Sequence, residues 1–160
     1  MATEIERKFL VVDDGWRAAA DAGTRFRQGY FFGPERASIR VRIEGEAANL
    51  NIKSAELGVR RREFEYPVPR ADAEEMLAEL CDQPPVEKTR YRVPHRGHDW
   101  EVDVFEGANA GLVVAEVELE SEDEMLELPD WVGREVSHEH RYYNVCLVHH
   151  PYRDWGADER

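Results

Sequence analysis

Polar and apolar residues alternate along most of the first 120 residues. In the stretch "TEIERKFL", residues 3–10, the charged residues Glu4, Glu6 and Lys8 occupy every second position. Successive side chains of a β-strand point to opposite faces, so a strand here would carry three charges on one side. The same period of two recurs over residues 25–32, 38–45, 48–54, 61–69, 86–94, 98–107 and 111–120. The pattern predicts about eight strands.

Short connections and a few helical patterns complete the picture. The connections "GPERA", "GEA", "HRG" and "ANA" are typical of hairpins, so consecutive strands are expected to be antiparallel. Residues 70–80 have apolar positions at helical spacing and predict an amphipathic helix that covers one side of the sheet. Shorter helices are expected over residues 13–23, 121–133 and 138–150. The fold class is mainly β with flanking helices (α+β), an eight-stranded antiparallel barrel or a sheet curled toward one.

The charged face of the first strand recurs on the other strands. The aligned polar residues are Arg40 and Arg42; Asn49, Asn51 and Lys53; Glu63 and Glu65; Lys88, Arg90 and Arg92; Glu101 and Asp103; and Glu116, Glu118 and Glu120. Two arrangements fit this pattern. The charges could face water around an apolar core, or they could line the lumen of a barrel whose apolar outer face lies beneath helices.

Segregation of charge sign favours the charged lumen. Acidic side chains gather on the first, fifth and eighth strands, and basic ones on the third, fourth and sixth. Blocks of like charge repel one another on an ordinary solvated face. Divalent cations such as Mg²⁺ or Mn²⁺ bind carboxylate oxygens, while bound phosphates would neutralise the basic block. The pattern therefore predicts a site for a metal ion and a polyanion.

Composition limits the partners. The chain has 160 residues, 42% of them hydrophobic, without a linker-like stretch, so one domain over residues 1–160 is expected. Its barrel strands would span about 3–120 with the helix at 70–80, and residues 121–155 would form a C-terminal helical segment. A net charge of −13 disfavours nucleic acid and membrane partners. Two isolated cysteines and the lack of a leader or spanning segment favour a soluble cytoplasmic protein.

The ordered set of motifs resembles the CYTH superfamily, also called the triphosphate tunnel metalloenzymes. Its Glu-x-Glu-x-Lys signature is matched by Glu4, Glu6 and Lys8. Further matches, in order along nearly the whole chain, are "SIRVRI", "NIKS", "EKTRY", "AEVELE" and the closing "RYYN". The resemblance is greatest to bacterial inorganic tripolyphosphatases, and it implies an eight-stranded tunnel that binds a triphosphate with one or two Mg²⁺ or Mn²⁺ ions.

The resemblance also implies roles for individual residues. Catalytic roles fall to Lys8, Glu4 and Glu6, where Lys8 would steady the triphosphate or the attacking water. The expected substrate ligands are Arg40, Arg42, Lys53, Lys88, Arg90 and Arg141. The expected metal ligands are Glu4, Glu6, Glu63, Glu65, Asp103, Glu116, Glu118 and Glu120. The C-terminal segment with Arg141 and Tyr142 is similar to the helix that plugs one mouth of the tunnel.

The expected reaction is hydrolysis of the terminal phosphate of inorganic tripolyphosphate by in-line attack of a metal-activated water. The alternatives are a class IV-type adenylyl cyclase, a thiamine triphosphatase of the same fold, and a non-catalytic polyphosphate-binding module. Trp100 falls on the expected outer face and Met76 on the packing stripe of a helix, so neither indicates a clamp for an organic group.

Some residues stay unassigned at this stage. The pairs His138 with His140 and His149 with His150 lack a third zinc ligand at suitable spacing. The alternation of its strand places Arg61 on the face of Glu63 and Glu65. Whether Arg25, Arg27 and Arg61 face the tunnel, and whether two copies of the chain pair as a homodimer, is left open.

Overall fold

Residues with alternating polarity form the strands of the computed structural model, which describes residues 2–31, 36–55 and 58–160. The strands are β1 (Ala2–Val11), β2 (Thr24–Tyr30), β3 (Ala37–Glu44), β4 (Ala47–Ser54), β5 (Arg60–Pro67), β6 (Val86–His95), β7 (His98–Phe105), β8 (Val113–Glu118) and β9 (Val132–Glu135). Two α-helices are described, α1 (Arg70–Glu79) and α2 (Asn144–His149). Short 3₁₀ helices lie at Gly15–Ala19, Gly107–Asn109, His140–Tyr142 and Tyr152–Asp154.

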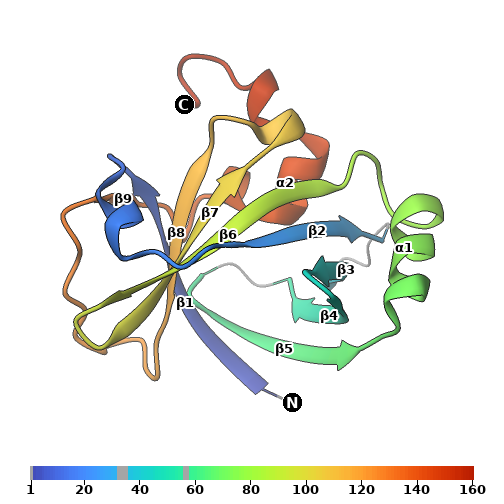
Figure 1. Cartoon of the computed structure of the whole chain (residues 1–160), viewed down its shortest axis with the longest axis horizontal. Coiled ribbons are helices and arrows are strands. Elements are labelled where there is room, and N and C mark those ends of the chain that lie inside the picture. Colours follow the sequence, from blue (N-terminus) through green and yellow to red (C-terminus); the bar gives the residue numbers. More distant parts are fainter. Residues whose placement is uncertain (1, 32–35, 56–57) are drawn as a thin grey trace.

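Eight of the strands close into a barrel (Figure 1). The order of neighbours is β5, β4, β3, β2, β6, β7, β8, β1, and a further pairing of β1 with β5 closes the ring. Every pairing is antiparallel. The predicted eight-stranded antiparallel barrel is therefore confirmed.

Strand β1 has three partners, and this explains a strand that the sequence pattern did not predict. Residues 2–5 of β1 pair with β5, and residues 6–10 pair with β8. The edge of β1 that faces β5 is unpaired with β5 beyond residue 5. Strand β9 pairs with this edge, and Phe9 is opposite Glu135. The short helix predicted over residues 121–133 is wrong, because this segment forms turns and coil that lead into β9.

The apolar outer face of the barrel is covered by helices and loops. Helix α1 packs Ala73 and Leu77 against Val41 and Ile43 of β3 (Figure 1). The helix predicted over residues 70–80 is thus confirmed. On the other side of the barrel, Trp100 is fully buried on the outer face of β7, as its alternation predicted.

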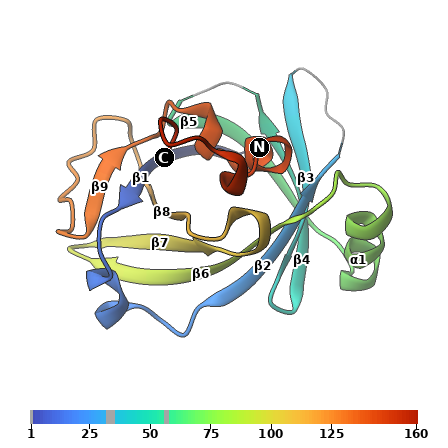
Figure 2. The ribbon, with the colours of Figure 1, turned by 90° about the horizontal axis from the view of Figure 1, so that it is seen from above.

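The C-terminal segment covers one end of the barrel. Seen from above, it lies over the opening of the ring, while α1 lies outside the ring (Figure 2). Leu147 and Val148 of α2 pack with Tyr30, Phe105 and other inward-facing apolar side chains. The helix predicted over residues 138–150 is shorter than expected, and a 3₁₀ turn precedes it.

Part of the predicted second strand and of the connection after it lies outside the described residues. The connection predicted at residues 33–37 and the last residue of the strand predicted over 25–32 lie largely outside them. Within the described part of the chain, no helix has the length and apolar character needed to cross a membrane. Cys81 and Cys146 are free thiols.

Candidate active site

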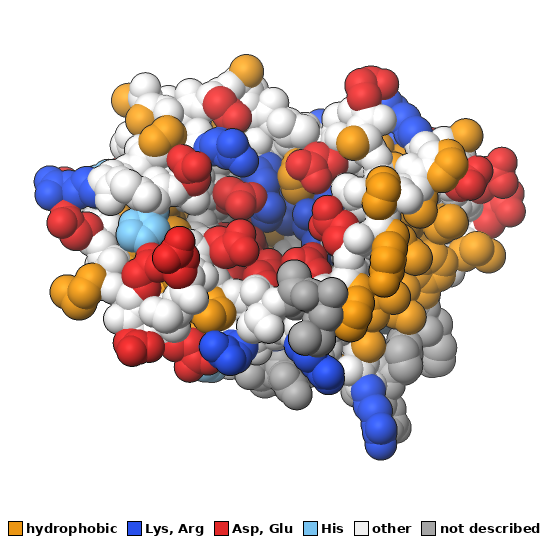
Figure 3. All heavy atoms as spheres, turned by 90° about the horizontal axis from the view of Figure 1, so that it is seen from below, with side chains coloured by type: hydrophobic (Ala, Val, Ile, Leu, Met, Phe, Trp, Pro, Cys, Tyr) orange, Lys and Arg blue, Asp and Glu red, His pale blue; other side chains and the backbone are white. Residues whose placement is uncertain are grey.

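The inward faces of the strands meet around a charged cavity. Its volume is about 150 Å³, and red and blue side chains surround a hollow in the view from below (Figure 3). Seven cationic and five acidic side chains line it. The lining residues are Glu4, Glu6, Lys8, Tyr30, Ser38, Arg40, Arg42, Lys53, Arg61, Glu63, Glu65, Lys88, Arg90, Glu116, Tyr143, Asn144 and Val145.

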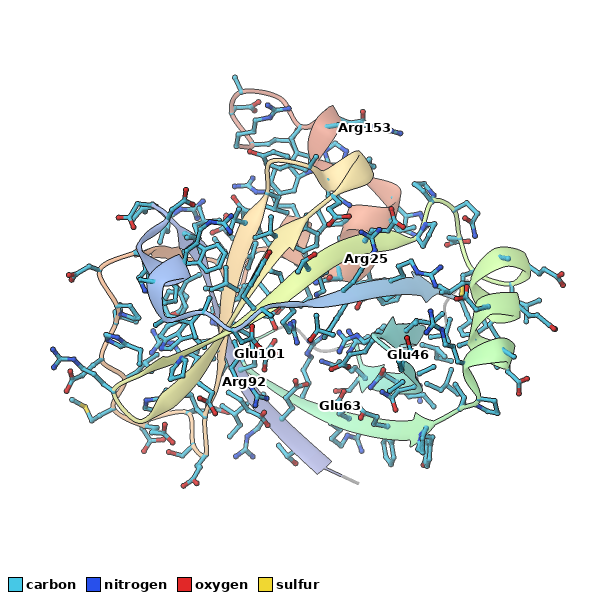
Figure 4. All side chains as sticks on the ribbon, viewed as in Figure 1. Arg25, Glu46, Glu63, Arg92, Glu101 and Arg153 are labelled. Carbon is cyan, nitrogen blue, oxygen red and sulfur yellow. The ribbon has the colours of Figure 1, made fainter. Side chains whose placement is uncertain are left out.

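The order of strands in the ring separates the charges by sign. Strands β8, β1 and β5 are consecutive neighbours and carry all five acidic residues of the lining. Strands β4, β3, β2 and β6 follow one another on the opposite arc and carry five of the seven cations. The side chains reach the space between β3, β4 and β5, where Glu63 is labelled on β5 (Figure 4). The segregation expected from the sequence is thus a property of the folded ring.

Glu6 lies at the centre of the acidic arc. Burial and the neighbouring carboxylate of Glu116 raise the pKa of Glu6 to about 8, against the attraction of Lys53 and Lys8. Glu4 lies in the same arc, but there burial is outweighed by Lys53 and Arg61, which lower the pKa of Glu4. The two carboxylates of the signature therefore differ in charge near neutral pH.

Glu116 is the carboxylate best supplied with cations. Its side chain lies 3.2 Å from Lys8 Nζ and 3.2 Å from Arg90 Nη2. Although burial acts in the opposite direction, these ion pairs, with Lys88, hold the pKa of Glu116 well below its usual range. Burial likewise disfavours the charged form of Lys8, yet Glu116 and Glu6 raise the pKa of Lys8. Glu116 is therefore charged, and it fixes Lys8 at the wall of the cavity.

A buried ion cluster lies behind the basic arc. Asp103 accepts hydrogen bonds from Lys88 Nζ at 2.7 Å and from Arg90 Nε at 2.7 Å. Arg90 also pairs with Glu101 and Glu116, whereas Lys88 has Asp103 as its only ion-pair partner among the described residues. Burial and the guanidinium groups of Arg90 and Arg42 lower the pKa of Lys88 to about 7, against the attraction of Asp103.

Three guanidinium groups that line the cavity have no carboxylate partner within the described residues. Arg40 donates to Asn51 Oδ1 at 3.4 Å, and Arg42 donates to Gln28 Oε1 at 2.9 Å. Arg61 lies over the ring of Tyr143, with 5.2 Å between its Cζ atom and the ring centroid. Burial and the nearby Arg40 and Arg90 lower the pKa of Arg42 to about 10. All three guanidinium groups thus face the cavity without an ion-pair partner at contact distance within the described residues.

Lys53 and Asn51 of β4 join the two arcs. Lys53 Nζ lies 2.9 Å from Glu4 Oε2 and 3.9 Å from Glu63 Oε1. Asn51 Nδ2 donates to Glu63 Oε1 at 3.2 Å and to Glu65 Oε2 at 2.6 Å. Strands β4 and β5 are therefore held by polar contacts on the inner side of the barrel.

Four of the residues expected in the site do not line the cavity. Asp103 is buried behind it. Glu118, the last residue of β8, is exposed, and burial with the neighbouring carboxylates of Glu4 and Glu101 raises its pKa. Glu120 is exposed beyond the end of β8. Arg141 forms an ion pair with Glu139 at 3.0 Å and lies outside the barrel's inner face. The other eleven expected residues are brought together around one space.

The structure also places the arginines that the sequence left open. Arg25 pairs with Glu87 and Glu106, and it lies on the outer side of β2 (Figure 4). Arg27 pairs with Glu74 of the outer helix α1. Arg61, by contrast, lines the cavity, as its alternation with Glu63 indicated.

Besides Arg61, five lining residues carry no role in the sequence-based assignment: Tyr30, Ser38, Tyr143, Asn144 and Val145. Ser38 and Tyr30 could have been found by extending the alternation. Ser38 shares the face of Arg40, and Tyr30 pairs with Arg40 in register. The other three come from the C-terminal segment, which has no period of two.

The carboxylates do not form a ready metal cage. Among the residues that the structure describes, no three His, Cys, Asp or Glu side chains are arranged so that they could hold a metal ion. This applies equally to the histidine pairs near the C-terminus. Glu4, Glu6 and Glu116 nevertheless line the same space, and burial together with the nearby carboxylate of Glu116 raises the pKa of Glu6 there.

Comparison with known proteins gives a consistent result. A family model described as CYTH domain matches residues 2–148. An inorganic triphosphatase of Acetivibrio thermocellus is 43% identical over 155 residues, which cover 97% of this chain and 99% of that protein. An inorganic triphosphatase of Nitrosomonas europaea is 39% identical over 153 residues, covering 91% and 97%. A crystal structure of an inorganic triphosphatase superposes with a TM-score of 0.65 at 35% identity, covering 92% of this chain and 95% of its own.

Proposed function

This chain belongs to the CYTH domain family, and from that premise we propose that it is an inorganic triphosphatase that removes the terminal phosphate of tripolyphosphate. Its relatives from Acetivibrio thermocellus and Nitrosomonas europaea, both inorganic triphosphatases, match it over almost their full length. The cavity described above supports the same activity on physical grounds.

The observation that carries the proposal is the set of uncompensated cations. Arg40, Arg42 and Arg61 line the cavity without a carboxylate partner among the described residues. Keeping buried charges unpaired is costly unless a ligand of opposite charge completes the site. Tripolyphosphate brings roughly four negative charges at neutral pH, and its oxygens match the fork of guanidinium donors.

The protein's own groups would act mainly by positioning and by stabilising charge. Arg40, Arg42 and Arg61 would hold the phosphate chain, and Lys88 and Arg90 would neutralise it from the basic arc. Lys8, fixed by Glu116 at 3.2 Å, would contact the phosphate at the acidic arc, where hydrolysis is proposed to occur. Asp103 lies behind the cavity and would align Lys88 and Arg90 rather than contact the substrate.

The acidic arc fits a divalent cation in part. Glu4, Glu6 and Glu116 would hold it, and because the protein does not offer three preassembled ligands within its described residues, phosphate oxygens and water would complete its shell, as is common for Mg²⁺. When bound, such an ion would neutralise phosphate oxygens and lower the pKa of a water molecule. A cation would also favour the charged form of Glu6, whose pKa is raised by burial and by the carboxylate of Glu116.

Phosphate release tests the proposal. Purified protein would be incubated with tripolyphosphate, pyrophosphate, ATP or thiamine triphosphate, each with Mg²⁺, Mn²⁺ or a chelator, while cyclic AMP is measured in the ATP samples. We expect rapid release from tripolyphosphate in the presence of metal and little from pyrophosphate. Preferred hydrolysis of an organic triphosphate, formation of cyclic AMP, or binding without any release would each contradict the proposal and favour one of the alternatives.

A further inference from the structure

Two neutral amides lie between two cations that line the cavity. Arg42 Nε donates to Gln28 Oε1 at 2.9 Å, and Gln28 Nε2 donates to Asn144 Oδ1 at 3.0 Å. Lys88 Nζ donates to the same Asn144 Oδ1 at 3.0 Å. Gln28 is fully buried on β2, and Asn144 is the first residue of α2. A continuous chain of hydrogen bonds thus runs from Arg42 to Lys88, and we call Gln28 and Asn144 the amide bridge.

The hydrogen bonds fix the orientation of both amides. Arg42 can only donate, so the oxygen of Gln28 faces Arg42 and its NH₂ group faces Asn144. The oxygen of Asn144 must then face Gln28 and Lys88, because both are donors. The Gln28 NH₂ group also donates to the hydroxyl of Tyr30 at 3.1 Å. The bridge therefore has one arrangement that satisfies its buried donors.

The bridge also fixes the direction of the Lys88 ammonium group. This group has three donors. One is taken by Asp103 at 2.7 Å and one by Asn144 at 3.0 Å. Lys88 lines the cavity, so its third donor is available to a ligand there. Without Asn144, the ammonium group would be held by Asp103 alone.

Neutral partners have a property that carboxylates lack at these positions. An amide oxygen satisfies a buried cationic donor without cancelling its charge, whereas a carboxylate would form an ion pair. Within the described residues, Arg42 has no carboxylate partner. The amide bridge thus keeps both cations in place, leaves the charge of Arg42 without an ion pair, and adds no negative charge to the one that Asp103 already supplies to Lys88.

We propose that the amide bridge positions Arg42 and Lys88 toward the phosphate chain, while it leaves Arg42 without a carboxylate partner and adds no second carboxylate to the pair of Lys88 with Asp103. This makes α2 a part of the substrate site as well as a cover for one end of the barrel. This inference rests on the proposed function. Asn144 and Gln28 are then positioning residues, since they act through the two cations.

The first test changes charge while it preserves shape. In Asn144→Asp, the carboxylate can still accept from Lys88 and Gln28, but it adds a second negative charge beside Lys88, which already pairs with Asp103. We expect KM for tripolyphosphate, and its dissociation constant measured by calorimetry without metal, to rise about tenfold or more. The thermal unfolding midpoint should stay at or above that of the wild type. The matched control is Asn109→Asp, since Asn109 is buried outside the cavity and accepts from Tyr152 N at 2.8 Å.

The second test measures coupling. Asn144→Ala should weaken tripolyphosphate binding, and this effect should largely disappear in a Lys88→Met background, because the positioned group is then absent. If Asn144→Asp does not fold, Gln28→Glu introduces the same kind of charge from the barrel side, with the same expected loss of affinity.

Two results would overturn the inference. One is an Asn144→Asp or Gln28→Glu variant that folds and binds tripolyphosphate within about twofold of the wild type, which is what a purely structural role of the bridge predicts. The other is full additivity of Asn144→Ala and Lys88→Met. If wild-type protein binds tripolyphosphate but releases no phosphate, the proposed function fails. The dissociation constants of the variants relative to the wild type still decide the role of the bridge in that case.

Discussion

Glu6 shows how neighbouring residues set the charge of a single side chain. Burial, Glu116 and Glu4 raise its pKa from the ordinary value of 4.5 to about 8. The folded protein therefore keeps this proton between about pH 4.5 and about pH 8, where the unfolded chain has lost it. Stability from Glu6 is fully present below the lower value and declines as pH rises through the upper one. The metal-free protein is destabilised by its own site at alkaline pH.

We predict that Glu6→Gln stabilises the metal-free protein at alkaline pH and abolishes turnover. The amide resembles the protonated acid, so the thermal unfolding midpoint should rise by about 2–4 °C at about pH 9 and change little at about pH 5. Scanning calorimetry at both values, with Glu120→Gln as the exposed control, measures the effect. A pH-independent shift would contradict the assigned titration, and unaltered turnover would contradict the metal role of Glu6.

We predict that Arg40→Ala weakens substrate binding. Arg40 is buried at the cavity and has no carboxylate partner among the described residues, so its removal leaves no carboxylate unpaired there. Loss of charge-assisted hydrogen bonds should raise KM for tripolyphosphate about 10- to 100-fold, with a smaller effect on kcat. Steady-state kinetics compares this variant with Arg25→Ala, which removes an arginine from the outer side of β2. Equal effects of both substitutions would exclude a local role for Arg40.

Among the elements, α1 demonstrates that the barrel is apolar on its outside. We predict that Leu77→Ala costs about 2–4 kcal/mol of unfolding free energy, because it removes buried methyl groups between α1 and β3. KM should change little, since Leu77 lies outside the cavity. Denaturant titration measures the loss, with Leu80→Ala as control because Leu80 is 63% exposed. A variant with wild-type stability would argue against tight packing of α1.

The strands were predictable from sequence, while the segment after residue 120 was not. Alternation gives each strand and the residues that share one of its faces, and the segregation of charge sign then indicates that the face with Arg40 and Glu116 lines the lumen. In residues 121–133, Met125, Leu126 and Leu128 resemble a helical stripe, yet Met125 is 90% exposed. Leu126 instead packs on the outer face of the barrel. Strand β9 pairs with the edge of β1 that β5 leaves free. This free edge exists only once the ring has closed, so the residue pattern of β9 alone does not reveal the strand.

The same reasoning explains which parts of the site escaped prediction. The resemblance implied a substrate-binding role for Arg141, the first residue of "RYYN". In the structure Tyr143 and Asn144 line the cavity, and Arg141 pairs with Glu139 instead. A 3₁₀ turn at His140–Tyr142 followed by a short helix has no simple repeat, so the facing side chains depend on how the segment docks.

For the whole molecule, the uncompensated cations of the cavity couple ligand binding to folding. We predict that tripolyphosphate alone, with a chelator present, raises the thermal unfolding midpoint. At a concentration about 100 times the dissociation constant, binding contributes about 2.7 kcal/mol, or roughly 5–10 °C. Differential scanning fluorimetry measures the midpoint with tripolyphosphate and, as the control, with sulfate at equal ionic strength. A general salt effect on a chain of net charge −13 would shift the midpoint equally with either anion. Equal shifts would contradict a specific site.

The meeting of β1 with both β5 and β8 has a consequence for the time course of folding. Glu4 and Glu6 lie on the first strand, whereas their neighbours in the cavity extend to Asn144, so the site comes into existence only when the two ends of the chain have found each other. Contacts so distant in sequence form late and slowly. During renaturation, return of hydrolysis should therefore lag behind return of the far-ultraviolet signal of the hairpins. Turnover would then report the final docking step of the two chain ends. A fragment that lacks either end should recover no hydrolysis.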